Sequence, residues 1–388
     1  MAHATSQQPG QNDRFDLSHT KYRRLVVKAG TSVITGNSDQ LDLVSLSRLV
    51  GQIAQLRQCG VDVVVVTSGA IAAGRQVLGS QSERKDIPYR QVLAAVGQGR
   101  LLHRYEELFS SRGVQVAQAL LTWNDLSDRQ RYLNVRSTLI TLLELGVVPI
   151  LNENDVVAVD EIGENFGDND RLSALVANLV DADLLVIFTD TEGLYTADPR
   201  LDPHATLIRQ VERVDETVLA MAGRQHSAGS RGGMPAKLEA ARLVTTSGIA
   251  MVICSGSLPD VLLRVACGEA IGTMFVPADS RLESRKRWML SGLNNRGEIV
   301  VDSGAQDALL RGNRSLLPPG IMGVRGQFQR GDIVYVLGSE GARLACGITN
   351  YSAGDIDQIK GSRSDRIHEL LGYHFGQEVI HRNNMVLV

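Results

Sequence analysis

The feature that most constrains the fold is a series of short apolar runs in the first two thirds of the chain. The runs are rich in Val, Ile and Leu and occupy residues 24–30, 61–69, 114–121, 147–155, 182–190 and 249–256. Each run is nearly continuous in apolar character, which is typical of strands buried on both faces of a parallel sheet. A Gly-, Ser-, Asn- or Asp-rich junction commonly follows such a run.

Helical periodicity fills the gaps between these runs. The helical patterns occupy residues 43–60, 89–113, 132–146 and 236–248, and each ends in a glycine, where a left-handed helix cap is favoured. Alternating strands and helices predict a three-layer α/β/α sandwich with a mainly parallel sheet. In open sheets of this kind, ligands bind beyond the carboxyl ends of the strands.

The pattern changes after Val276, where a charged and then Gly/Asn-rich stretch is typical of a linker. Short strands separated by turns follow, which predicts a small β-rich domain. The predicted organisation is a disordered tail (1–21), an α/β domain (22–277), a linker (278–296), a β-rich domain (297–376) and a C-terminal tail (377–388).

Composition excludes several classes of function. The 388 residues are 43% hydrophobic and carry a net charge of −3, so no global field attracts nucleic acid or anionic lipid. The four scattered cysteines form no CxxC motif, which argues against a disulfide framework or a zinc site. No apolar run reaches the length of a membrane span, and the polar N-terminus lacks the core of a secretory signal. We therefore expect a cytoplasmic protein that does not bind membranes.

Polar residues that are suited to binding or catalysis gather directly after the apolar runs. Each has a simpler interpretation when taken alone, because glycines often form turns and an Asp before a helix is commonly an N-cap. A lysine at a helix start is less easily explained, since that end of the helix dipole repels cations. Their coincidence at the ligand-binding edge favours an anion site. The residues are Lys28, Gly30, Ser68, Gly69, Asn152, Asn154, Asp155, Asp168, Asn169, Asp170, Thr189, Asp190, Gly232, Gly233 and Lys237.

Seven ordered motifs give the chain a clear resemblance to the amino-acid kinase family. They are VVKAGTSVITG, VVVVTSGAIAAGR, VLAAVGQGR, PILNENDVVA, FGDNDRLSAL, TDTEGLYTADPR and GGMPAKLEAA, which extend from Val26 to Ala241. The stretch from Gly297 to Gly376 resembles a PUA module. Together the resemblances cover nearly the whole chain from Leu25 onward.

The resemblance implies phosphoryl transfer from MgATP to the side-chain carboxylate of L-glutamate. The product would be L-glutamyl 5-phosphate, the first intermediate of L-proline biosynthesis. An acceptor carboxylate is already ionised at neutral pH, so no general base is needed. By resemblance, Lys28 contacts the transferring phosphoryl group, Lys237 bridges the ATP phosphates, and Asp170 holds both ammonium groups.

The resemblance also implies binding residues for both substrates. L-Glutamate would be bound by Ser68, Asp155 and Asn169, with Asp155 suited to the α-ammonium group. Magnesium would be held largely by ATP phosphates and water, and no protein ligand is assigned. The implied nucleotide-binding residues are Lys28, Gly30, Thr189, Asp190, Arg231, Gly232, Gly233, Met234, Pro235, Ala236 and Lys237.

One loop departs from the family pattern. Family members tend to read TGGMxTK, whereas this chain reads RGGMPAK from Arg231 to Lys237. Arg231 replaces a hydroxyl residue, and Pro235 and Ala236 replace a small polar pair. Proline is tolerated at the first positions of a helix, so the departure affects the details of nucleotide contact more than the lysine and glycines.

The partners implied by the resemblance are a second copy of the chain and a feedback inhibitor. Family members form homo-oligomers, dimers or tetramers, and are inhibited by L-proline. RNA binding by the PUA-like region is disfavoured, because its basic residues are spread among acids and its aromatics are few. A structural or regulatory role of this region is favoured instead.

Two alternative functions remain open. A related kinase could use N-acetylglutamate, but that substrate lacks the α-ammonium group and would leave Asp155 without a partner. A sensor or RNA-binding protein built on an inactive kinase fold would be expected to lose Lys28, Asp170 or Lys237. All three residues are present.

Overall fold

The computed structural model describes residues 17, 20–36, 38–79, 86–157, 169–222, 233–277, 297–312 and 314–387. The predicted linker and most of the predicted N-terminal tail lie outside these residues. The chain divides into two compact units. The first comprises residues 1–122 and 138–278, and the second comprises residues 123–137 and 279–388.

An eight-stranded sheet forms the centre of the first unit, with the order β3-β4-β2-β1-β5-β7-β8-β6. The six neighbouring strands β3, β4, β2, β1, β5 and β7 pair in parallel. Strand β8 is antiparallel to β7, and β6 pairs in parallel with β8. The mainly parallel sheet is therefore confirmed. The strands are β1 (Arg24–Ala29), β2 (Asp62–Thr67), β3 (Val116–Leu121), β4 (Val148–Glu153), β5 (Leu184–Thr189), β6 (Gln210–Val211), β7 (Ala250–Ser255) and β8 (Thr273–Phe275).

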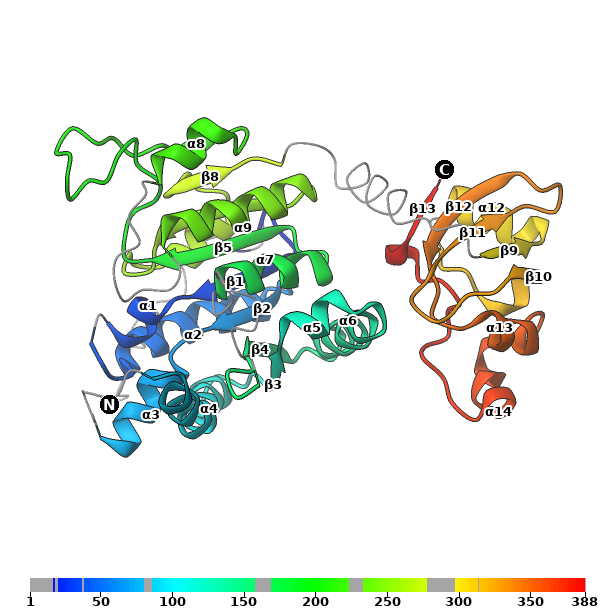
Figure 1. The fold of residues 1–388 in the computed structure, drawn as a ribbon, viewed down its shortest axis with the longest axis horizontal. Helices are drawn as coiled ribbons and strands as arrows, with labels where there is room; N and C mark the ends of the chain where they lie inside the picture. The colour runs from blue at the N-terminus through cyan, green and yellow to red at the C-terminus, as the bar shows by residue number, and fades with distance from the viewer. Residues whose placement is uncertain are drawn as a thin grey trace, which may run out of the picture. The chain divides into compact units, whose positions relative to one another are not determined.

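Helices cover this sheet in two layers. In one layer, α7 and α9 contact each other, and α7 contacts β1 and β5 while α9 contacts β7 (drawn in green in Figure 1). In the other layer, α2 contacts β2 and also contacts the helices α1, α4 and α10. Alternate residues of β1 face the two layers. Leu25, Val27 and Ala29 pack with the residues of α2, and Lys28 faces the other side, toward α7. The three-layer sandwich is thus confirmed.

Helices α2, α4 and α9 begin and end close to three of the predicted helical patterns, whereas the other helices of the first unit had no predicted bounds. Gly60, Gly113, Gly146 and Gly248 have φ values of 79°, 71°, 78° and 77°, so the predicted left-handed conformation is confirmed at each. The helices are α1 (Thr31–Thr35), α2 (Leu43–Gln58), α3 (Ala70–Leu78), α4 (Ile87–Ser110), α7 (Asn169–Leu179), α8 (Glu216–Met221), α9 (Met234–Thr246) and α10 (Val261–Ala266).

Two glycines allow α3 and α4 to cross with their backbones in contact. A Cβ atom on Gly97 would lie 1.8 Å from the carbonyl oxygen of Ala70, and one on Gly74 would lie 2.0 Å from that of Leu93. No side chain larger than hydrogen fits at either position. The crossing therefore fixes α4 against the first turn of α3.

The second unit contains a five-stranded sheet with the order β10-β9-β11-β12-β13. This finding confirms a β-rich region. The sheet also includes β13, and Val379 and Ile380 join its core, so residues predicted as a C-terminal tail (377–388) pack into the second unit. The short helices around the sheet were not predicted. The strands are β9 (Gly297–Val301), β10 (Ile321–Gly326), β11 (Ile333–Leu337), β12 (Arg343–Ile348) and β13 (Met385–Leu387). The helices are α12 (Ser303–Gly312), α13 (Ala353–Ile359) and α14 (Ile367–Leu371), with short 3₁₀ turns at Pro318–Gly320, Ser364–Arg366 and Arg382–Asn384.

Residues 123–137 also belong to the second unit. They contain α5 (Trp123–Ser127) and the first part of α6 (Arg129–Glu144). Leu133 packs in one apolar cluster with Ile333, Ile348 and Val386. Asn134 accepts a hydrogen bond of 2.6 Å from Arg330. The sheet of the second unit therefore gains part of its apolar contact from a distant chain segment.

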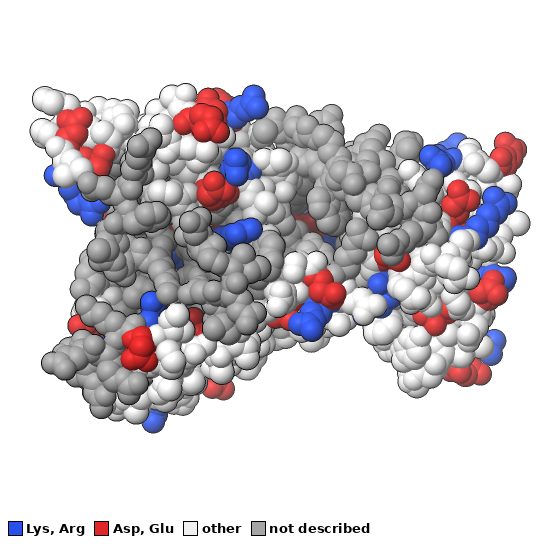
Figure 2. Space-filling view, in the orientation of Figure 1, with Lys and Arg blue, Asp and Glu red and all other residues white. Residues whose placement is uncertain are grey.

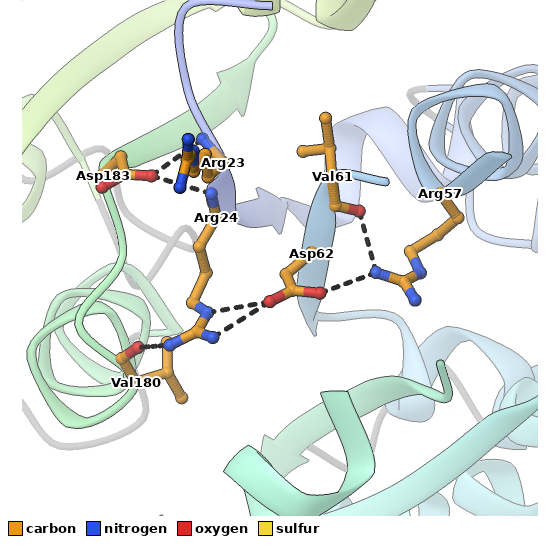
Figure 3. A network of polar contacts seen from close by, with 7 residues as sticks. All are labelled: Arg23, Arg24, Arg57, Val61, Asp62, Val180 and Asp183. Atoms are coloured by element: carbon orange, nitrogen blue, oxygen red, sulfur yellow. Dashed lines mark hydrogen bonds and ion pairs between the residues drawn. The ribbon is translucent and has the colours of Figure 1, made fainter. Parts of the chain in front are cut away.

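A polar network joins the amino ends of β1 and β2 (Figure 3). Arg24 donates to Asp62 through Nη2 at 3.0 Å and to the carbonyl of Val180 at 2.6 Å. Arg57 donates to the other oxygen of Asp62 at 2.8 Å, and Asp183 accepts from the backbone N–H of Arg24 at 2.9 Å. The network lies at the edge of the sheet opposite the ligand-binding edge, and it links β1, β2, α2 and the segment before β5.

We predict that Asp62→Ala destabilises the first unit. The change leaves Arg24 and Arg57 without their shared carboxylate in a half-buried position, so the free energy of unfolding should fall by about 1–3 kcal/mol. Urea denaturation at pH 7 measures the loss. As a control, Asp39→Ala removes a carboxylate that is 92% exposed and should leave the denaturation midpoint unchanged. Equal midpoints for both variants would contradict a stabilising role of the network.

Candidate active site

Three charged side chains from separate elements meet beside the carboxyl end of β1. Lys28 Nζ lies 2.5 Å from Asp170 Oδ1, and Lys237 Nζ lies 3.0 Å from Asp170 Oδ2. Lys28 comes from β1, Asp170 from the first turn of α7, and Lys237 from the first turn of α9. Their exposed fractions are 6%, 0% and 7%, respectively. We call these three residues the buried triad.

The two lysines keep the Asp170 carboxyl group ionised. Burial raises the pKa of Asp170, but the charges and hydrogen bonds of Lys28 and Lys237 outweigh this effect, so the pKa lies below its ordinary value. Two ammonium groups against one carboxylate leave the buried triad with a surplus of one positive charge. This net positive charge attracts an anionic ligand.

Three helices, α1, α3 and α9, begin after a glycine and lack a side-chain cap. Gly69, with a φ of 103°, precedes α3, and Gly233 precedes α9. By contrast, α2 and α4 begin at Asp42 and Asp86, whose carboxylates accept hydrogen bonds from the first backbone N–H groups. Within the described ranges, no side chain caps the first N–H groups of α3 and α9, so these groups can bind an anion, with the exception of Pro235, which has no N–H.

Gly30 brings the backbone close to the ammonium group of Lys28. A Cβ atom at this position would lie 3.4 Å from Lys28 Nζ and 3.4 Å from the carbonyl oxygen of Phe188. Glycine therefore leaves room around the ammonium group that a side chain would reduce.

A cluster of amide and hydroxyl groups lies beside the carboxyl ends of β2 and β4. The Nδ2 atom of Asn169 donates to the carbonyl of Thr67 at 3.0 Å, to Ser68 Oγ at 2.9 Å and to Asn152 Oδ1 at 3.1 Å. The Oδ1 atom of Asn169 is buried and has no hydrogen-bond partner in the described part of the chain. The structure thus brings together Ser68 and Asn169, two of the residues predicted to bind the amino acid.

The other described residues predicted to bind the amino acid or the nucleotide lie at the ends of β4 and β5 and at the start of α9. Asp155 follows β4 and is half-buried, and Thr189 ends β5 and donates to Asp190 at 3.0 Å. Met234, Pro235 and Ala236 form the first turn of α9. Arg231 and Gly232 lie outside the described residues. The sequence assigned no role to Gln98 or Asn152, although both lie in quoted motifs, because their pairing depends on a contact between α4 and β4.

Two kinds of feature are absent from the described part of the chain. Among the described residues, no group of three or more His, Cys, Asp or Glu side chains gathers as a metal site would require. The described helices include none with the length and apolarity to cross a bilayer.

Comparison with known proteins gives consistent matches for both regions of the chain. Residues 23–255 match the sequence model of the amino acid kinase family, and residues 297–371 match that of the PUA domain. A glutamate 5-kinase of Dehalococcoides mccartyi strain CBDB1 is 51% identical over 373 residues, which are 96% of this chain and 100% of the relative. A glutamate 5-kinase of Herpetosiphon aurantiacus is 53% identical over 365 residues, which are 94% and 98%.

One solved structure with detectable similarity is UMP kinase from Bacillus anthracis. It is 18% identical, with a TM-score of 0.46, and the match covers 66% of this chain and 97% of that chain.

We predict that Asp170→Asn destabilises the protein in a pH-dependent manner. The variant leaves two buried ammonium groups without a counter-charge, which should lower the free energy of unfolding by about 3–5 kcal/mol at pH 7. Because the folded pKa of Asp170 is depressed, its stabilising contribution is complete above the unfolded value of about 3.9 and is lost only as pH falls through the lower folded pKa.

Urea denaturation of both proteins between pH 7 and pH 3 measures this difference. The gap between the two proteins should stay constant from pH 7 to about pH 5 and shrink below about pH 4. A gap that closes near neutral pH would mean that Asp170 is not held ionised by the two lysines.

Proposed function

The chain belongs to the amino acid kinase family, and we propose that it transfers the γ-phosphoryl group of ATP to the side-chain carboxylate of L-glutamate. The product, L-glutamyl 5-phosphate, is the first intermediate of L-proline biosynthesis. Relatives that are about half identical over nearly the whole chain bear the name glutamate 5-kinase. The observation that carries the chemistry is the buried triad, whose surplus positive charge suits a phosphoryl group.

The reaction requires two anions to approach each other. The acceptor carboxylate is ionised at neutral pH and needs no base, so positioning and positive charge must supply most of the catalysis. We assign Lys28 to the transferring phosphoryl group and Lys237 to the ATP phosphates. Asp170 keeps both ammonium groups in place through charge-assisted hydrogen bonds.

The amino acid has its own binding residues in this proposal. Ser68 and Asn169 are joined by a hydrogen bond of 2.9 Å and lie where the carboxyl end of β2 meets the start of α7. Asn169 presents a buried acceptor oxygen without a partner among the described residues, and Asp155 adds a carboxylate after β4. Both groups are suited to the α-ammonium group of L-glutamate, which N-acetylglutamate lacks.

The nucleotide is assigned to the carboxyl ends of β1 and β5 and to the start of α9. Gly30 and Gly233 allow backbone N–H groups to approach the phosphates, and Thr189 and Asp190 follow β5. Met234, Pro235 and Ala236 continue from Gly233 to Lys237. We keep Arg231 and Gly232 in the nucleotide site as a proposal from the sequence alone.

Magnesium fits the site through ATP more readily than through the protein. The oxygens of Asp170 contact the two lysines, and no cluster of three acidic, His or Cys residues occurs in the described ranges. We propose that the ATP phosphates and water hold the ion, which usually retains several waters. It would neutralise phosphate charge during transfer.

Several broader properties follow from the family resemblance. We propose a homo-oligomer, dimer or tetramer, with feedback inhibition by L-proline at the amino-acid site. A cytoplasmic location suits consumption of ATP and the four free cysteines. In the second unit, Lys/Arg and Asp/Glu side chains alternate on the face drawn in Figure 2, which favours a structural or regulatory role over RNA binding.

We predict that Lys28→Met and Lys237→Met each abolish most of the activity. With ATP, magnesium and hydroxylamine, the wild type should form γ-glutamyl hydroxamate from L-glutamate, and each variant should lose about 10²- to 10³-fold in kcat/KM. The loss arises because a positive charge aimed at the phosphoryl group is removed. Lys21→Met, which changes an exposed lysine before β1, is the matched control and should retain full activity.

The same assay with N-acetyl-L-glutamate separates the alternatives. Hydroxamate from the acetylated substrate alone would retain the kinase fold but reject the role of Asp155 and Asn169. Absence of product from either substrate would favour the sensor interpretation.

A further inference from the structure

The motif VLAAVGQGR places a glutamine against the amino-acid site. Its central residues lie on α4, where Gly97 touches the first turn of α3 so closely that a Cβ would lie 1.8 Å from the Ala70 carbonyl. Gln98 is the next residue on α4, and its side chain reaches Asn152 on β4. No role in phosphoryl transfer accounts for this glutamine.

Gln98 begins a chain of three amides that reaches Asn169. Its Oε1 atom accepts a hydrogen bond of 2.8 Å from Asn152 Nδ2. Asn152 Oδ1 in turn accepts from the Nδ2 atom of Asn169 at 3.1 Å. The three residues come from α4, β4 and α7, and we call them the amide relay.

Two backbone groups fix the direction of the amide relay. The N–H of Glu153 can only donate, and it donates to Asn152 Oδ1 at 2.9 Å, so the amide nitrogen of Asn152 must face the acceptor on Gln98. The carbonyl of Thr67 can only accept, so the nitrogen of Asn169 faces it at 3.0 Å. The oxygen of Asn169 is then turned away from all three of its partners, buried and without a partner among the described residues.

The Oδ1 atom of Asn169 is a hydrogen-bond acceptor, so it favours a hydrogen-bond donor on the substrate. At neutral pH both carboxylates of L-glutamate are ionised, and its α-ammonium group is its only hydrogen-bond donor. We propose that Gln98 is a positioning residue for the amino acid: by accepting from Asn152, it holds Asn169 with Oδ1 directed to the α-ammonium group. This inference rests on the proposed function, because it takes L-glutamate as the substrate.

The test compares substitutions that keep or remove the acceptor on Gln98. Gln98→Met preserves volume but removes the acceptor, and it should raise the KM for L-glutamate about 3- to 10-fold. The kcat and the KM for ATP should change less than about twofold, because the buried triad is untouched. Gln98→Glu retains an acceptor oxygen and should keep the KM within about threefold of the wild type.

Two further variants separate positioning from general destabilisation. Gln52→Met removes a buried glutamine whose Oε1 accepts from Leu262 N at 2.8 Å, away from the site, and it should lower Tm without altering KM. Asn169→Ala removes the end of the amide relay. Adding Gln98→Met to Asn169→Ala should therefore cause no further rise in KM.

The outcomes distinguish this inference from the proposed function. An active wild type with an unchanged KM in Gln98→Met overturns the inference alone, as does a full additional rise of KM in the double variant. A similar rise in Gln52→Met would also overturn it, because the effect would then be general. A wild type that forms no hydroxamate from L-glutamate overturns both the proposed function and this inference.

Discussion

A carboxylate buried between two lysines is the interaction on which the rest of the structure depends. Asp170 has no exposed surface, and the charges and hydrogen bonds of Lys28 and Lys237 hold its pKa below the ordinary value. The lysines equally depend on Asp170, because an ammonium group buried without a counter-charge would be strongly destabilising. The surplus positive charge that remains can be neutralised by an incoming phosphoryl group. Stability and catalysis therefore place the same demand on the relative positions of β1, α7 and α9.

The amino and carboxyl ends of the parallel strands differ in the polar groups that they carry. At the amino ends, Arg24 and Arg57 both donate to Asp62, and these hydrogen bonds hold β1, β2 and α2 together. At the carboxyl ends, glycines precede α3 and α9 and leave their first N–H groups without side-chain caps. The amino ends of the strands contribute hydrogen bonds to stability, whereas we propose that the N–H groups at the carboxyl ends form their hydrogen bonds with the substrate.

Much of this arrangement could be predicted because it depends on local patterns. Continuous apolar runs indicated the six long strands of the parallel sheet, and the parallel topology indicated that the polar residues after them would share one edge. The strands β6 and β8 have at most three residues, too few for a periodic signal, and they exist because neighbouring strands pair with them. Gly97 was unpredictable for a related reason, since a glycine in a helical pattern indicates only local weakening until its contact with Ala70 is known.

Neutral amides are the appropriate chemistry for the side of the site that recognises the amino acid. A carboxylate in place of Asn152 or Asn169 would also attract an ammonium group, but it would add negative charge close to the carboxylate that must receive the phosphoryl group. It would also compete with phosphate for the surplus charge of the buried triad. Amides present acceptors without net charge, and their direction is set by backbone groups that cannot reverse roles. In the proposed site, Asp155 supplies the carboxylate for the α-ammonium group, and the amides add hydrogen-bond geometry without drawing further on the surplus charge of the buried triad.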